Sequence, residues 1–151
     1  MRILITAIIF SATAALGSIA DPPVGTGLIL RPFDRPSSMF AAGHRGVDLQ
    51  AAELDLVRSP ISGKVHFAGY VVDRPVITIS TGSILMSMEP VESFRFKGDQ
   101  IIRGQLIGIV ARGGHCDQKC VHVGVRRINT RYYLDPIPYL LQLPRLLAAR
   151  P

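Results

Sequence analysis

The segment Gly43-His44-Arg45-Gly46-Val47-Asp48-Leu49 places a histidine four residues before an aspartate. An imidazole and a carboxylate can bind one divalent metal ion when their donor atoms meet. The two glycines make a helix improbable here, and on a straight strand His44 and Asp48 would lie about 13 Å apart. Only a kinked or bulged strand brings them to one ion, and Gly46 is the residue that permits the kink. The same spacing is also typical of a surface turn that carries both residues by chance.

A second candidate segment is Cys120-Val121-His122-Val123-Gly124-Val125. Its alternation predicts a β-strand whose three valines face the core, so that Cys120, His122 and Gly124 point to the opposite face. A neutral imidazole on a rigid strand, with a glycine beside it to leave room, suits a zinc ligand. With His44 and Asp48, His122 would form a His₂Asp set that leaves a fourth position open, which is the layout of a catalytic zinc site.

The two cysteines of the chain, Cys116 and Cys120, are four residues apart and allow two interpretations. In an exported chain a short-loop disulfide is the default. Alternatively, Cys120 is a metal thiolate beside His115 and His122. His115 itself is either an exposed loop residue or a neighbour of the metal. His66 alternates with lysine in a predicted strand and is expected to be solvated.

The elements that must position these residues are short strands. The chain has 151 residues, of which 48% are hydrophobic and 19% charged, with 14 glycines and 11 prolines. That is enough for one domain with an aliphatic core, and it excludes a long coiled coil and argues against disorder. Alternating segments are found at 64–67, 75–80, 83–88, 105–110 and 121–125. We therefore expect an all-β fold with one antiparallel sheet system, covered by the two ends of the chain, and at most a short C-terminal helix.

Residues 1–20 are predicted to be a secretory signal peptide. Arg2 precedes an apolar run, and Ser18-Ile19-Ala20 has the small residues of a cleavage site. A membrane anchor is the alternative, although the uncharged stretch is marginal for a span. The net charge is +6, but the arginines are scattered without interleaved aromatic residues, which argues against nucleic-acid binding. We expect a secreted protein with a weak attraction to anionic surfaces or polymers.

Six motifs, taken in order, give the chain a family resemblance. They are Arg31-Pro32-Phe33-Asp34, the segment 43–49, Ser59-Pro60-Ile61-Ser62-Gly63-Lys64-Val65-His66-Phe67-Ala68-Gly69, Gly98-Asp99, Gly104-Gln105-Leu106-Ile107-Gly108 and the segment 120–125. This combination resembles the lysostaphin-like (β-lytic) zinc metallopeptidases, and more narrowly their small secreted actinobacterial branch with paired cysteines.

The resemblance covers residues 31–140 and implies a single curved antiparallel sheet with a groove, the duplicated hybrid motif type. On this basis we divide the chain into the signal peptide (1–20), an extended lead-in (21–42), a metallopeptidase-like β domain (43–140) and a C-terminal tail (141–151). The implied activity is hydrolysis of peptide cross-links in bacterial peptidoglycan. His44 and Asp48 match the family's first two zinc ligands, and His122 matches the third. We expect a monomer at the cell wall whose partners are stem or cross-link peptides.

The chain departs from the family at both histidines that handle protons. Cys120 replaces the first histidine of the family's His-x-His motif, and Met88-Glu89-Pro90 occupies the place of the other, give or take one residue. Glu89 and His115 are the candidate replacements. Since the loss of general acid-base help lowers the rate about 10²- to 10⁴-fold, two functions remain open. The protein is either an active zinc endopeptidase or a catalytically degenerate domain that binds wall peptides or regulates another wall hydrolase.

Overall fold

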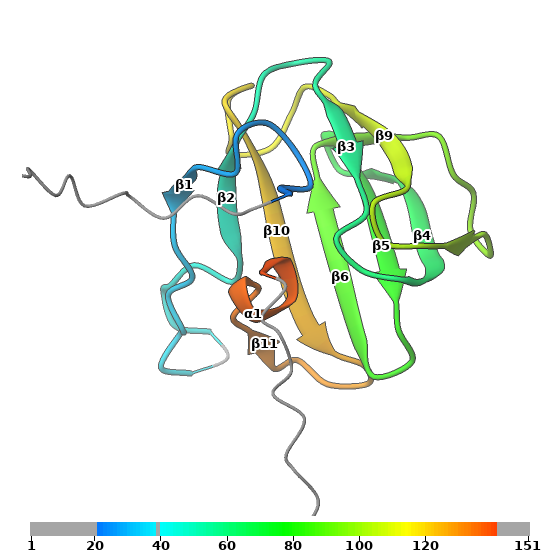
Figure 1. Cartoon of the computed structure of the whole chain (residues 1–151). Coiled ribbons are helices and arrows are strands. Elements are labelled where there is room, and N and C mark those ends of the chain that lie inside the picture. Colours follow the sequence, from blue (N-terminus) through cyan, green and yellow to red (C-terminus); the bar gives the residue numbers. More distant parts are fainter. Residues whose placement is uncertain (1–20, 39, 142–151) are drawn as a thin grey trace, which may run out of the picture.

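A computed structural model describes residues 21–38 and 40–141 (Figure 1). The predicted signal peptide, and the predicted tail from residue 142 onward, lie outside the described residues. Within the described part of the chain, no helix is long and apolar enough to cross a membrane. The proposed boundaries at residues 20, 42 and 140 stay predictions.

The large sheet is antiparallel throughout, with strand order β1-β2-β10-β6-β5-β4-β8, and β11 pairs with the second half of β10. Its strands are β1 (Ile29–Arg31), β2 (Val47–Gln50), β4 (Gly63–Val71), β5 (Arg74–Ser80), β6 (Ile84–Glu89), β8 (Gln100–Ile101), β10 (Cys120–Arg127) and β11 (Tyr133–Leu134). The neighbouring central strands β10 and β6 pair from His122↔Glu89 to Arg127↔Ile84. This pairing fixes the register of the face that carries the candidate site.

A second, smaller sheet has the order β3-β9-β7 and lies over one face of the large sheet (Figure 1). Its strands are β3 (Leu56–Arg58), β7 (Val91–Ser93) and β9 (Leu106–Val110). A short helix, α1 (Ile137–Leu140), covers the same side of the molecule and buries Leu140 completely. The core lies between these layers, and its fully buried side chains are mostly aliphatic, among them Val47, Leu49, Ile77, Ile79, Met86, Met88, Val121, Val123 and Val125.

The all-β antiparallel fold and the short helix are confirmed. The three valines of β10 are buried as predicted, and His66 on β4 is exposed. The predicted hairpin around Thr81-Gly82 joins β5 to β6. The structure adds the separate three-stranded sheet, whose strands are each at most five residues long. Pairing between segments so short and so far apart in sequence is set by packing rather than by their own pattern.

Candidate metal centre

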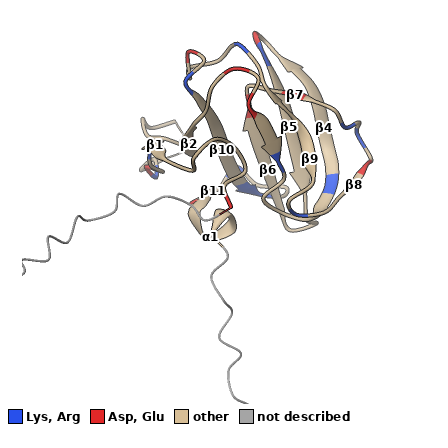
Figure 2. Ribbon diagram, turned by 45° about the horizontal axis from the view of Figure 1, so that its top comes forward, with Lys and Arg blue, Asp and Glu red and all other residues tan. Residues whose placement is uncertain are grey.

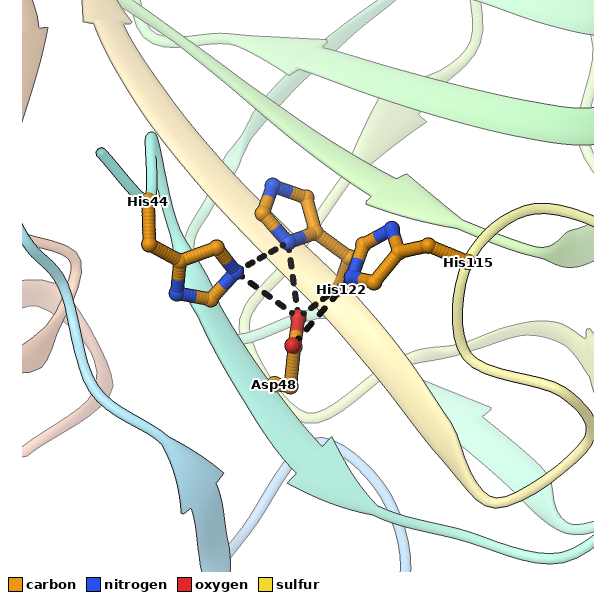
Figure 3. Close-up of side chains that lie close together, drawn as sticks. All are labelled: His44, Asp48, His115 and His122. Atoms are coloured by element: carbon orange, nitrogen blue, oxygen red, sulfur yellow. Dashed lines mark hydrogen bonds and ion pairs between the residues drawn. The ribbon is translucent and has the colours of Figure 1, made fainter. Parts of the chain in front are cut away.

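Asp48 and His122 come together because β2 and β10 are neighbours. The two residues are paired in register, and their buried neighbours Val47, Leu49, Val121 and Val123 turn both side chains to the face opposite the core. His122 Nδ1 lies 2.8 Å from Asp48 Oδ1. Figure 3 shows both side chains pointing into one cluster.

His44 reaches the same cluster from outside the strand. It forms an isolated bridge with Asp34, and the chain bends at residues 45 and 46 before β2 begins. His44 Nε2 lies 3.1 Å from Asp48 Oδ1 and 3.2 Å from His122 Nδ1. The predicted kinked segment is therefore present, and it brings His44, Asp48 and His122 together.

Gly46 has a steric role that the sequence argument did not identify. A Cβ at this position would lie 2.4 Å from the carbonyl oxygen of Val123 and 2.5 Å from Nε2 of His122. Side chains do not approach backbone atoms so closely. Glycine is therefore required at position 46 because β10 and the ring of His122 pass directly over it.

The protonation pattern of the cluster favours a cation. His44 Nδ1 lies 2.7 Å from the carbonyl oxygen of Pro32, which can only accept, so Nδ1 carries a proton and donates it. In a neutral ring Nε2 then presents its lone pair to the carboxylate of Asp48. A backbone carbonyl that orients an imidazole in this way is the usual second partner of a metal-binding histidine.

The distances within the cluster also fit a metal ion. The three donor atoms of His44, Asp48 and His122 are 2.8, 3.1 and 3.2 Å apart. Ligands at 2.0–2.1 Å from a tetrahedral zinc ion lie about 3.3 Å from one another. The side chains of His44 and Asp48 are each 5% exposed and that of His122 is 16% exposed, so the ligand atoms are held in place by packing.

His115 completes a cluster of four side chains. Its Nε2 lies 3.1 and 3.2 Å from the two carboxylate oxygens of Asp48, while its own side chain is 47% exposed. Burial alone would raise the pKa of Asp48, but hydrogen bonds with His122 and His115 and the charges of His122 and His44 outweigh burial and hold the pKa below its ordinary value of 3.8. Asp48 is therefore ionised at neutral pH, as a metal ligand must be.

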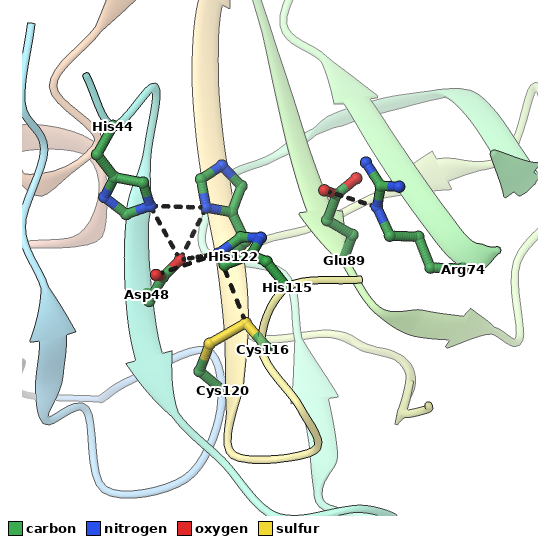
Figure 4. The surroundings of a disulfide bond; sticks show 8 residues. All are labelled: His44, Asp48, Arg74, Glu89, His115, Cys116, Cys120 and His122. Atoms are coloured by element: carbon green, nitrogen blue, oxygen red, sulfur yellow. Dashed lines mark hydrogen bonds and ion pairs between the residues drawn. A yellow bond between two sulfur atoms is a disulfide. The ribbon is translucent and has the colours of Figure 1, made fainter. Parts of the chain in front are cut away.

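The loop that carries His115 is closed by a disulfide between Cys116 and Cys120, whose Cα atoms are 5.0 Å apart (Figure 4). The predicted disulfide is thus present. The alternative, in which Cys120 is a metal thiolate, is wrong for this structure because both sulfurs are used in the covalent bond. Cys120 begins β10, and the bond ties the residue after His115 to that strand.

Glu89 lies on the other side of His122 from Asp48 (Figure 4). It is paired in register with His122 across β10 and β6, so Asp48, His122 and Glu89 form one row across three strands. Glu89 Oε1 is 2.9 Å from Nε of Arg74, the first residue of β5. Arg74 also pairs with Asp73, whose Oδ1 lies 3.0 Å from its Nη1. Burial alone would lower the pKa of Arg74, but Glu89 and Asp73 outweigh burial and raise it.

Arg74 was not identified from the sequence. Its partner Glu89 is fifteen positions away and on another strand, so no local motif links them. The hairpin predicted at Thr81-Gly82 was the one feature of the sequence that could have suggested this pair, because its register brings β5 beside β6. The structure thus brings the three predicted ligands and His115 together and places Glu89 one strand away from them.

A small all-β fold with a His-Asp-His cluster on the sheet face opposite the core is the arrangement of the lysostaphin-like metallopeptidase class. The sequence model of Peptidase family M23 matches residues 42–136, and the chain belongs to this family. An uncharacterized protein of Mycobacterium tuberculosis is 32% identical over 121 residues, which are 77% of this chain and 49% of the relative. The chain thus spans about half the length of the curated relatives it matches.

The solved structures that share the fold include lysostaphin and a zinc-containing peptidase. Lysostaphin, solved by NMR, superposes with a TM-score of 0.63 at 20% identity, over 85% of this chain and 55% of that chain. A zinc-containing peptidase from Vibrio cholerae superposes with a TM-score of 0.61 at 19% identity, over 79% of this chain and 39% of that chain. At these identities the comparison shows the fold alone.

Proposed function

We propose that the protein is a secreted zinc metalloendopeptidase that acts on peptide cross-links of bacterial peptidoglycan. The observation that carries the proposal is the convergence of His44 Nε2, Asp48 Oδ1 and His122 Nδ1 within 3.2 Å of one another on the sheet face opposite the core. Membership of peptidase family M23 and the zinc-containing relative in fold support the choice of metal and reaction. The disulfide favours an oxidising compartment outside the cytoplasm.

His44, Asp48 and His122 are the residues that would hold zinc. Bound zinc supplies Lewis-acid activation of a water molecule and of the scissile carbonyl. Pro32 fixes the tautomer of His44, and the low pKa of Asp48 keeps its carboxylate charged and available. These contacts hold the ligands in one arrangement before any substrate arrives.

His115 is the residue we assign to proton transfer. Its ring is half exposed, yet its Nε2 is within hydrogen-bonding distance of Asp48, so it can exchange protons with a substrate beside the metal ligands. Cys120 occupies the strand position where the resemblance places a catalytic histidine, and through Cys116 it fastens the loop that delivers His115. We propose that an imidazole from this loop replaces the missing one from the strand.

Glu89 is the second residue that we assign to the reaction. Its carboxylate is held by Arg74 at 2.9 Å and is 17% exposed. It faces the same groove as His122 and can accept a hydrogen bond from a water molecule or from a substrate N–H. The neighbouring guanidinium keeps it in one position.

A specific observation also favours the alternative function, a domain that binds wall peptides or regulates another hydrolase. One expected proton-handling position, Cys120, is used in a disulfide, and Glu89, at the other, is engaged in an ion pair. The metal cluster and the groove would then serve recognition without chemistry. The two functions differ in whether peptide bonds are broken.

The test uses the purified protein and measures bound zinc by mass spectrometry and new amino groups released from peptidoglycan. We expect one zinc per chain and release of amino groups by the wild type. His122→Ala should lose both, and His115→Gln should keep zinc but lose about 10²-fold or more in rate. His66→Ala, which removes an exposed histidine of β4, is the matched control and should change neither. A zinc-loaded wild type that releases no amino groups would refute the peptidase proposal and favour the binding domain.

A further inference from the structure

A groove of about 360 Å³ runs along the sheet face that carries the metal cluster. His122, Gly124 and Arg126 of β10 line it in succession, while Val123 and Val125 between them are buried in the core. The groove therefore has His122 at one end and Arg126 further along the same strand.

The middle of the groove has a floor of small side chains. Gly124 is paired with Ser87 of β6, and Ser87 is paired with Thr78 of β5. The hydroxyls of Ser87 and Thr78 are hydrogen-bonded to each other at 2.8 Å. A Cβ at Gly124 would make only ordinary contacts, 3.4 Å from the oxygen of Arg45 and 3.6 Å from Nε2 of His122, so no side chain fills the groove at this point. This row leaves room for an extended peptide backbone.

The groove and two hollows that adjoin it at Arg45 and Tyr133 are strongly basic. Their lining residues include one carboxylate, Glu89, which pairs with Arg74, as does Asp73 outside the lining. The arginines that line them are Arg35, Arg45, Arg74, Arg126 and Arg131. The basic end of β10 is visible in Figure 2. This concentration contrasts with the scattered arginines of the linear sequence and favours an anionic ligand.

Arg126 is the arginine that the register places at the far end of the groove. It is partly buried, and its Nη1 donates one hydrogen bond to the carbonyl oxygen of Thr130 at 3.1 Å. Among the residues that the structure describes, Arg126 makes no ion pair. A guanidinium has five N–H donors in a planar fork that fits a carboxylate, so Arg126 can hold one with charge-assisted hydrogen bonds.

We propose that Arg126 is a specificity residue that binds a free carboxylate of the peptide substrate. Arg126 is four residues from His122 on a regular strand, which corresponds to about 13 Å. An extended peptide whose scissile carbonyl lies at the metal ligands advances by about the same rise per residue, so the selected carboxylate lies two to four residues from the scissile bond. The placement of the scissile bond at the metal cluster rests on the proposed function. The preference for a carboxylate does not, because binding is measured without cleavage.

The probes are hexapeptides of alanine and glycine with blocked ends. Each carries one glutamate at a successive position, and its partner carries glutamine there. A further peptide has no glutamate but a free C-terminal carboxylate, which separates a side-chain source from a chain end. Binding to the purified full chain is measured by calorimetry, and mass spectrometry checks that each peptide stays intact.

The variants are Arg126→Gln, Arg126→Lys and the control Arg58→Gln. Arg58 is exposed on β3, and like Arg126 it donates to one backbone carbonyl, that of Gly104, at 3.1 Å. Arg58→Gln thus removes the same charge and the same kind of bond from another surface. At the best position we expect the glutamate or free-carboxylate peptide to bind wild type about tenfold more tightly than its neutral partner. The ratio should remain in Arg58→Gln, fall in Arg126→Lys and approach one in Arg126→Gln.

If wild type binds the glutamate peptide and the glutamine peptide of every pair with equal affinity, the proposal is overturned. This comparison needs no variant. An equal loss of preference in Arg126→Gln and Arg58→Gln would also overturn the proposal, because the effect would then be one of overall charge. Tighter binding of poly(glycerol phosphate), lost in Arg126→Gln, would assign the groove to phosphate polymers instead. If the preference holds but no peptide bond is ever cleaved, the peptidase proposal fails and the carboxylate site stands.

Discussion

Replacing Gly46 with alanine is expected to break the proposed metal site without changing any of its proposed ligands. The new Cβ would lie 2.4 Å from the oxygen of Val123 and 2.5 and 2.6 Å from two atoms of the His122 ring. Ordinary contact begins at about 3.4 Å, so the segment at residue 46 and β10 must separate by about 1 Å. Metal–ligand distances tolerate only about ±0.2 Å, so His122 would be withdrawn from the cluster. Overpacking of this kind typically also costs about 1–3 kcal/mol in stability.

The matched control is Gly124→Ala. It makes the same change beside the same ring, but its Cβ would lie 3.4 Å from the oxygen of Arg45 and 3.6 Å from Nε2 of His122. Zinc affinity is measured by competition with a chromophoric chelator, and unfolding is followed with and without zinc. We expect at least a tenfold loss of affinity in Gly46→Ala and a change of less than about threefold in Gly124→Ala. A folded Gly46→Ala protein with wild-type affinity would refute the steric argument.

Three further changes separate the parts of the site. Replacing both Cys116 and Cys120 with serine should release the loop of His115. Peptidoglycan turnover should then fall at least tenfold while the zinc content stays the same. Unchanged turnover would show that the disulfide does not position His115. Glu89→Gln should lower kcat more than tenfold with zinc retained, and full activity in a steady-state assay would remove Glu89 from the reaction. Met88 is fully buried in the core, so Met88→Ala should lower the free energy of unfolding in urea by about 2–5 kcal/mol and leave the proposed ligands in place. Loss of zinc from the folded variant would contradict the separation of core and site.

The part of the structure that the sequence could predict follows from the alternation of apolar and polar residues along single strands. The spacing of Val121, Val123 and Val125 identified the core face of β10 and so placed His122 on the other side. A side chain's direction on a strand depends only on its parity, which is a local property. By the same rule Gly124 and Arg126 share the face of His122, and these three residues line the groove.

The contributions of His115 and Arg74 could not be predicted in the same way. His115 lies on a loop, and its position depends on where the disulfide draws that loop. Arg74 meets Glu89 across a hairpin, and Gly46 is needed because β10 passes over it. Each of these contacts joins segments distant in sequence, so the three-dimensional register decides them rather than local propensity.

X-ray absorption at the zinc edge of the purified protein tests most directly whether His44, Asp48 and His122 share one metal ion. We predict one zinc per chain, surrounded only by nitrogen and oxygen atoms at about 2.0–2.2 Å, with the imidazole signal reduced in His44→Ala. A sulfur ligand at about 2.3 Å would mean that the cysteines bind the metal instead. Absence of stoichiometric zinc from wild type, after purification in zinc-containing buffer, would contradict the metal site itself.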